Sequence, residues 1–329
     1  MSIVHFLYLS AGHGAAWPAV AWLAPLLALS LAAGLLVGAV FPAEGSRRDR
    51  IPDGRPALPL VGVMFGAFGV WLFSTSLYAT IEYPHASHPS TTQPYEPPPS
   101  EIAFVSTVPP LLGFLALLLG DQFAREACDQ DLGTNLRRLI PGLIPGIIGV
   151  VIIVPPLMFL IAPLVELIYR HVHYHHPTEH PFLRTLGGKP SLGVTVAIVV
   201  GACVIAPLFE ELLFRGHLQT LIRRGIGRLF ANRVELVGNS VDPAMAGPSA
   251  PIFIDASRPS SIQTWAAIII TSAIFAAIHP LWSQPMIFIL ALGLGYSYER
   301  TNNLWVPVSI HAGFNTINTA IFLLSLYKG

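Results

Sequence analysis

The sequence predicts an all-α integral membrane protein, with about eight transmembrane helices and a polar site inside the helix bundle. Of its 329 residues, 53% are hydrophobic and only 11% are charged, whereas soluble domains carry about 25% charged residues. A helix needs about 20 apolar residues to cross a bilayer. Apolar segments of about this length recur from one end of the chain to the other. These two observations favour a multi-pass protein of the cell membrane, with the lipid bilayer as its first partner.

Eight apolar segments are long enough to be considered as transmembrane helices. They cover residues 17–41, 57–79, 102–120, 139–169, 190–222, 262–279, 285–299 and 304–327. No basic region precedes the first segment, so we expect no cleavable signal peptide. Repeated prolines in the fourth, in "LIPGLIPG" and "VPPLMFLIAP", predict a kinked helix.

The distribution of arginine among the loops predicts an orientation. The loops after the first, third and fifth helices are rich in arginine, as is typical of cytoplasmic loops. The loop after the second helix, "EYPHASHPSTTQPYEPPPSE", has no basic residue. The arginine-rich loops are therefore expected inside, and both chain termini outside.

The chain divides into two predicted parts. Residues 1–188 hold the N-terminal helices and loops, and residues 189–329 form the core that carries the site. Within that core, residues 231–260 lose the apolar period and are interpreted as an insertion loop. The preceding stretch, "LQTLIRRGIGRLF", spaces its apolar residues as an interfacial amphipathic helix does.

Charge and cysteine content exclude several kinds of partner and site. The formal net charge is zero, which argues against binding of nucleic acid. Cys128 and Cys203 are the only cysteines, too few for a disulfide framework or a cysteine-based zinc site. The histidines of "YRHVHYHHPTEHP" are interpreted as loop residues at the membrane surface, and Glu166 with Arg170 as a local ion pair.

Three groups of polar residues interrupt the apolar second half of the chain. In "FEELLFR", Glu211 and Arg215 are four residues apart and share one helix face, while Glu210 points about 100° away. Charged side chains within a span are costly and usually mark a functional site. The alternative is a helix end at which all three residues meet water.

The second and third groups lie on two later helices. Phe275 and His279 share a face of one helix, and His311 and Asn315 share a face of the last. Alternatively, His279 is an ordinary interfacial histidine, and Asn315 joins helices by hydrogen bonds. Taken jointly, the three groups supply a general base, a second acid or base and neutral hydrogen-bond donors. Attack of water on an amide needs this set.

These residues carry a resemblance to a known family. "EELLFR", "FAAIH" and "HAGFN" look like its motifs EExxxR, FxxxH and HxxxN, in the same order and on successive helices. Together they resemble the CPBP family of intramembrane glutamic endopeptidases. That family includes the type II prenyl endopeptidases that process CAAX termini and the Abi-type proteins linked to bacteriocin processing and immunity. The resemblance covers about residues 190–329.

The resemblance implies a role for each matching residue. Glu210 would activate a water with the help of His279, and that water would attack a peptide bond of a membrane-associated peptide or protein, such as a prenylated CAAX terminus. His311 and Asn315 would stabilise the oxyanion. Glu211 and Arg215 would hold the helix and its electrostatics in place, and some accounts give the second glutamate a catalytic part. No metal or other cofactor is implied.

Other functions fit parts of the same pattern. Glu210, His279 and His311 form a plausible zinc set with a metal-bound water as nucleophile, although Asn315 would be a poor ligand. An Abi-type immunity or scaffold protein would keep the fold without catalysis. A transporter with a Glu and His relay would more often show an internal repeat, which this sequence does not show.

The predicted helices leave one geometric conflict. At 1.5 Å per residue, Glu210 is placed about 20 Å from the inner surface and His311 only about 10 Å from the inner end of its helix. Helix tilt, a kink at Gly216 or Pro307, or a different helix count would have to bring the two side chains together.

Overall fold

A computed structural model describes residues 58–82, 97–125, 136–174, 180–226 and 261–326. These residues form helices joined by short connections, and no strand occurs among them. The all-α fold is therefore confirmed for this part of the chain. The predicted first span at 17–41 and the predicted insertion loop at 231–260 lie outside the described residues.

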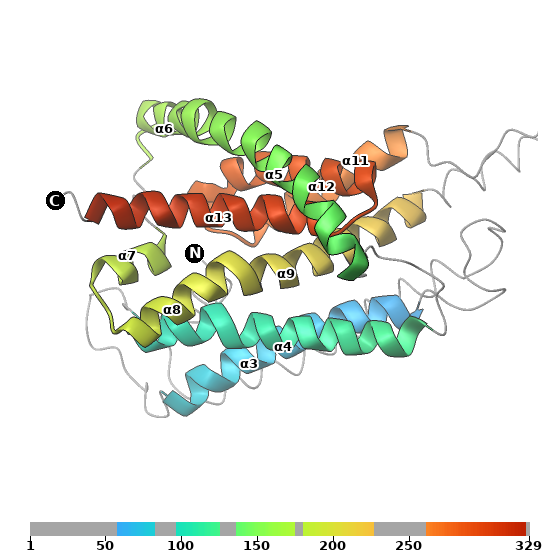
Figure 1. Cartoon of the computed structure of the whole chain (residues 1–329), viewed down its shortest axis with the longest axis horizontal. Helices are drawn as coiled ribbons and strands as arrows, with labels where there is room; N and C mark the ends of the chain where they lie inside the picture. Colours follow the sequence, from blue (N-terminus) through green and yellow to red (C-terminus); the bar gives the residue numbers. More distant parts are fainter. Residues whose placement is uncertain (1–57, 83–96, 126–135, 175–179, 227–260, 327–329) are drawn as a thin grey trace, which may run out of the picture.

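The helices run roughly along the long axis of the molecule, with α5 and α6 inclined across them (Figure 1). In chain order they are α3 (Leu58–Glu82), α4 (Pro99–Arg125), η1 (Leu136–Arg138), α5 (Leu139–Pro156), η2 (Leu157–Ile161), α6 (Ala162–His171), α7 (Pro181–Gly187), α8 (Leu192–Val200), η3 (Gly201–Ile205), α9 (Ala206–Glu211), η4 (Leu212–Gln219), α11 (Ser261–Ala277), η6 (Leu281–Ser283), α12 (Gln284–Thr301) and α13 (Trp305–Leu326).

Every predicted span from the second onward coincides with helix, and four helical segments of the described chain are long and apolar enough to cross a membrane. These four are Val61–Tyr78, Pro99–Gly120, Leu136–His171 and Leu192–Ile226. Ser261–Ala277 is apolar but shorter. The membrane character is thus supported, whereas the number of eight spans stays a prediction.

Two of these long helices contain wide turns of π type. η2 follows Pro155 and Pro156, where the sequence predicted a kink. η3 and η4 stand on either side of α9, the short segment that ends with Glu210 and Glu211. Helical structure then continues to Ile226, so residues 218–226 of the predicted interfacial helix are the end of this long helix. Single π turns inside helices frequently occur at functional sites.

Small residues allow the helices to approach closely, as is common in membranes. α5 packs on α13 through glycines, and a Cβ atom added to Gly146 would lie 2.5 Å from Cβ of Ser309. At Gly201 in η3, an added Cβ would lie 2.4 Å from the backbone oxygen of Ser106 in α4. These contacts fix the positions of α13 and η3, both of which carry site residues or bind them.

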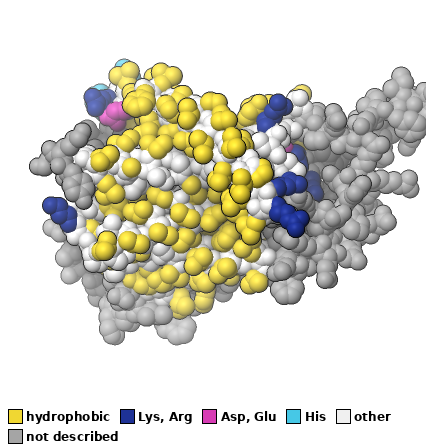
Figure 2. All heavy atoms as spheres, in the orientation of Figure 1, with side chains coloured by type: hydrophobic (Ala, Val, Ile, Leu, Met, Phe, Trp, Pro, Cys, Tyr) yellow, Lys and Arg dark blue, Asp and Glu magenta, His cyan; other side chains and the backbone are white. Residues whose placement is uncertain are grey.

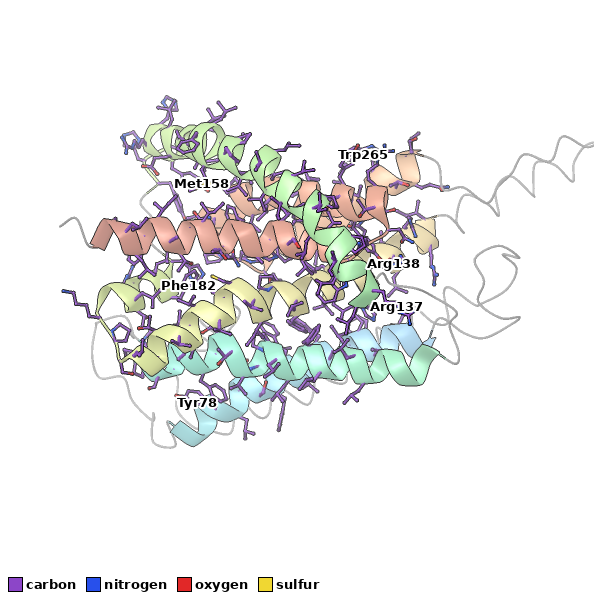
Figure 3. The ribbon with its side chains drawn as sticks, viewed as in Figure 1. Tyr78, Arg137, Arg138, Met158, Phe182 and Trp265 are labelled. Atoms are coloured by element: carbon purple, nitrogen blue, oxygen red, sulfur yellow. The ribbon has the colours of Figure 1, made fainter. Side chains whose placement is uncertain are left out.

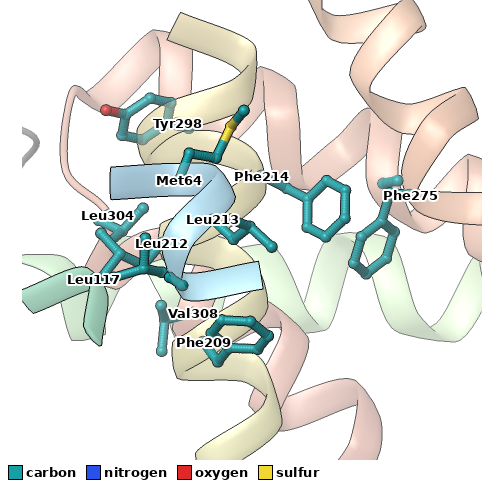
Figure 4. Close-up of a cluster of buried hydrophobic side chains, with 12 residues drawn as sticks. Met64, Leu117, Phe209, Leu212, Leu213, Phe214, Phe275, Tyr298, Leu304 and Val308 are labelled. Atoms are coloured by element: carbon teal, nitrogen blue, oxygen red, sulfur yellow. The ribbon is translucent and has the colours of Figure 1, made fainter. Parts of the chain in front are cut away.

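The outer surface fits a lipid environment. Apolar side chains of α5 and η2, such as Ile140, Ile147 and Phe159, are more than half exposed. Figure 2 shows hydrophobic side chains over most of the visible face, with basic ones at its two ends. Arg137 and Arg138 lie at one of these ends, where α5 begins (Figure 3). The long segment of α9 and η4 lies within the bundle, and its residues Phe209, Leu212 and Leu213 belong to the main apolar core (Figure 4).

Candidate active site

The first predicted pair is a buried ion pair. Arg215 Nη1 donates to Glu211 Oε1 at 3.0 Å, and the two side chains are 1% and 0% exposed. Arg215 Nη2 also reaches the backbone oxygen of Ala291 in α12, at 3.4 Å. The alternative in which these residues meet water at a helix end is therefore wrong for this pair. Because a buried charge without a partner costs about 3–5 kcal/mol, each member depends on the other.

Phe275 lies between the charged residues and the histidines. Its ring is 4.5 Å from the Arg215 guanidinium carbon, in the geometry of a cation–π contact. The centroid of the same ring lies 4.7 Å from that of the His279 ring and 5.9 Å from that of the His311 ring, which it meets edge to face. Phe214 packs on Phe275 in a T-shaped arrangement with 4.9 Å between the ring centroids, and both residues are labelled in Figure 4. The sequence placed Phe275 on the face of His279, but gave no signal that it also meets Arg215 and His311.

His279 follows the end of α11 and has a defined orientation. Its Nδ1 lies 2.7 Å from the backbone oxygen of Phe275, and a carbonyl can only accept a hydrogen bond. Nδ1 therefore carries the proton, and Nε2 of the neutral ring keeps its lone pair. The side-chain amide of Gln284 donates to the backbone oxygen of His279 at 3.0 Å, which ties down the turn. Nε2 can thus accept a proton from water.

His311 contacts both glutamates of α9. Its Nδ1 lies 2.9 Å from Glu211 Oε1, and its Nε2 lies 3.9 Å from Glu210 Oε2. His311 and Glu211 are buried, whereas the Glu210 side chain is 23% exposed. Glu210 is therefore the carboxylate with access to a small molecule, and Glu211 the one enclosed by protein.

These contacts resolve the conflict over helix depth. His311 is near the start of α13, yet Leu304 immediately before that helix is already buried. In Figure 1 the connection between α12 and α13 lies short of the ends of α11 and of the long helix that contains η4. The last helix thus begins inside the bundle, and the two residues meet without a break at Gly216 or Pro307.

Asn315 lies one turn beyond His311 and is bound to η3. Its Nδ2 donates to the backbone oxygen of Ala202 at 2.7 Å. In a π turn a backbone carbonyl can lose its usual helical partner, and a side chain from a neighbouring helix can then replace it. This bond between helices is the structural role that the sequence offered as the alternative for Asn315. The side-chain amide of Asn315 has two N–H groups, and the bond to Ala202 uses one of them.

His180, which the sequence assigned to a surface loop, lies beside the site. It caps α7 by accepting from Phe182 N at 3.4 Å. Burial lowers the pKa of His180 to about 3, with a smaller contribution from neighbouring His279. Residues 175–179 of the same histidine-rich stretch are outside the described part of the chain. The predicted pair of Glu166 and Arg170 is present at 2.8 Å and is exposed.

The structure brings together most of the predicted residues. Glu211, Arg215, His279 and His311 contact one another directly or through Phe275, and Glu210 faces His311. Within the described ranges, no three His, Cys, Asp or Glu side chains are grouped as the ligands of a metal would be. This arrangement gives no specific support to the zinc set of Glu210, His279 and His311.

Comparison with known proteins adds independent information. Residues 192–317, a little over a third of the chain, match the family model described as type II CAAX prenyl endopeptidase Rce1-like. No curated protein and no solved structure matches the chain in the corresponding searches. The matched segment contains all six predicted site residues, from Glu210 to Asn315. This part of the chain is therefore recognised as Rce1-like, which confirms the family resemblance drawn from its three motifs.

Proposed function

We propose that the protein is an intramembrane endopeptidase that uses a glutamate-activated water to hydrolyse a peptide bond of a membrane-associated substrate. The observation that carries this proposal is the partly exposed Glu210, 3.9 Å from Nε2 of a histidine that is itself bound to a buried carboxylate. The Rce1-like match to residues 192–317 supports the same reaction class.

In the proposed reaction, Glu210 and His279 share the activation of water. The Glu210 carboxylate accepts one proton of the water, and His279 Nε2, which keeps its lone pair, accepts a hydrogen bond from it. The water oxygen then attacks the carbonyl carbon of the scissile peptide bond. Low dielectric surroundings strengthen these interactions, because the site lies inside an apolar bundle.

His311 and Asn315 are the proposed donors to the oxyanion. They are four residues apart on α13, and His311 Nε2 faces the same space as Glu210. A donor matters most where charge develops in the transition state. Glu211 and Arg215 form the buried ion pair behind His311, and in this proposal they do not touch the substrate.

The proposed substrate is the C-terminal segment of a prenylated, CAAX-type protein in the bilayer. This class comes from the description of the matched family. An apolar exterior and four helices long and apolar enough to span a membrane support this proposal, because a lipid-modified peptide also lies in the bilayer. We propose a multi-pass location in the cell membrane for the same reason.

The test is cleavage by purified protein in detergent or liposomes. A fluorogenic peptide ending in a farnesylated CAAX sequence would be compared with the same peptide without the prenyl group, and Glu210→Ala is the inactive control. Cleavage of the prenylated peptide by wild type alone supports the whole proposal. Cleavage of both peptides supports the endopeptidase and rejects the prenyl requirement. Failure to cleave either of them, or any membrane peptide of a library, favours the Abi-type scaffold instead.

A further inference from the structure

Glu211 accepts two hydrogen bonds on one oxygen. Oε1 of this carboxylate lies 3.0 Å from Arg215 Nη1 and 2.9 Å from His311 Nδ1. All three side chains are at least 95% buried. Because the buried Arg215 guanidinium can only donate and its charge needs a partner, Glu211 faces it as a carboxylate, which can only accept.

This contact determines where His311 carries its proton. Facing an ionised carboxylate, Nδ1 must be the donor and therefore keeps its hydrogen. A proton on Nε2 as well makes the ring an imidazolium. His311 Nε2 can consequently donate to an oxyanion only when the ring is a cation.

Four charged or titratable groups face His311. From α9 come Glu210 and Glu211, from η4 Arg215, and from the turn after α11 His279. Two further groups of described elements contact α13 or the residues before it. Cys203 of η3 contacts Thr319, two turns beyond His311, and Arg138 of η1 contacts Asn302, before the helix begins.

The charges of Glu211 and Arg215 cancel each other. Glu210 is then balanced if His311 is an imidazolium, and a charge without a partner inside a membrane protein is costly. The neutral site therefore holds one proton for Glu210 and His311 together. That proton is on His311 Nε2 or on Glu210 Oε2, which are 3.9 Å apart.

We propose that Glu211 is a positioning residue that keeps the proton of His311 on Nδ1, so that its Nε2 proton can stabilise the oxyanion and then be given to the leaving amine. This inference deepens the proposed endopeptidase function and rests on it. It gives the enclosed glutamate a defined task that differs from that of Glu210.

The proton balance of this cycle closes. Glu210 takes a proton from water as the water oxygen bonds to the carbonyl carbon and the C=O electron pair moves onto oxygen. When the C–N bond breaks, its electron pair stays on nitrogen, which takes the Nε2 proton of His311. The products are a carboxylic acid and an amine, and the enzyme holds its single proton on Glu210. Transfer of that proton to Nε2 restores the starting state.

The pH profile of kcat/KM tests the role of Glu211. Activity requires the imidazolium, so the rate falls on the alkaline side as His311 loses its Nε2 proton. The Glu211 carboxylate stabilises the cation, because it accepts the Nδ1 hydrogen bond of His311. In Glu211→Gln the alkaline limb should therefore move toward lower pH relative to wild type.

The matched control is Glu299→Gln. Glu299 is also a nearly buried carboxylate with an arginine partner, since its Oε2 lies 2.6 Å from Arg223 Nη1 and its side chain is 7% exposed. It also accepts from Gln219 at 2.9 Å and has no part in the proposed site. The alkaline limb of the Glu299→Gln pH profile should match that of wild type. An unmoved limb in Glu211→Gln, or an equal shift in both variants, overturns the inference.

A second measurement covers the case in which Glu211→Gln does not fold. Spectra of protein labelled with ¹⁵N-histidine, assigned by comparison with His311→Gln, report which ring nitrogen of His311 is protonated. The inference expects a protonated Nδ1 on both sides of the titration, and an Nδ1 without a proton overturns it. This reading needs no substrate. Wild type that shows the protonated Nδ1 but cleaves nothing would sink the endopeptidase proposal and leave the Nδ1 assignment standing.

Discussion

At the scale of single residues, the two adjacent glutamates of "EELLFR" have different surroundings. Glu211 is enclosed and bound to Arg215 and His311, whereas Glu210 is 23% exposed and its Oε2 lies 3.9 Å from Nε2 of His311. Replacing Glu211 should therefore affect folding as well as the reaction, whereas replacing Glu210 should affect the reaction alone.

Glu210→Gln is expected to abolish hydrolysis and to leave folding nearly intact. The amide keeps the shape of the side chain but cannot take a proton from water. Among the described residues, the substitution removes only the 3.9 Å contact with His311, so folding should change little. Turnover and the thermal midpoint would be measured on the same preparation. Normal turnover in this variant would exclude the glutamate mechanism.

Asn315→Ala separates the two roles of that residue. As an oxyanion donor, Asn315 should contribute about 10²–10³ to the rate constant, with little change in apparent substrate affinity. As a link between helices, through its bond to the Ala202 carbonyl, it should contribute about 0.6 kcal/mol to stability and leave turnover per folded molecule unchanged.

The matched control for Asn315 is Asn318→Ala. Asn318 donates to the backbone oxygen of Phe314 at 2.8 Å, a bond within its own helix. Loss of turnover in Asn315→Ala alone supports the oxyanion role. Normal turnover together with earlier melting would remove Asn315 from the site and weaken the case for His311.

At the scale of helices, periodicity in the sequence predicted much of what is observed. The i, i+4 spacing of Glu211 and Arg215 predicted their ion pair, and the three motifs predicted which helices would meet. Spacing along one helix cannot show how deep another helix starts, so the contact of His311 with Glu210 and Glu211 looked difficult from the predicted spans. It depends on the buried start of α13, which tertiary packing sets.

The π turns on either side of α9 could not be predicted from the sequence either. A single wide turn changes the phase of the following residues, but leaves the composition apolar and helical. Their effect is seen in η3, whose Ala202 carbonyl binds Asn315. Close contacts with a neighbouring helix, such as that of Gly201 with α4, are likewise visible only in three dimensions.

Gly201→Ala should disturb η3 and, through it, Asn315. An added Cβ would lie 2.4 Å from the backbone oxygen of Ser106, so α4 and η3 must separate. Overpacking of this kind costs about 1–3 kcal/mol of stability. The control is Gly193→Ala in α8, where an added Cβ meets nothing within 4 Å. Equal thermal midpoints for the two variants would contradict the close approach of η3 to α4.

At the scale of the whole molecule, the apolar exterior and the basic residues at the ends of the bundle define how the protein should lie in a membrane. Leu136–His171 is a candidate span with Arg137 and Arg138 at its start. Its exposed apolar side chains lie between those arginines and the far end of α6. Because arginine is enriched in cytoplasmic loops, the start of this span is expected inside and its end outside.

Labelling of single cysteines tests this orientation. In a background with Cys128→Ser and Cys203→Ser, we would introduce either Arg137→Cys at the start of the span or His171→Cys at its end, both exposed positions. A maleimide that cannot cross the membrane should label His171→Cys in intact cells and Arg137→Cys only after the membrane is permeabilised. Arg138 remains next to the labelling position at residue 137, so one arginine is still present at that end of the span. The reverse pattern would show that the basic end of this span faces outward. Labelling of both positions in intact cells would mean that this segment does not span the membrane, although its 36 residues are apolar enough to do so.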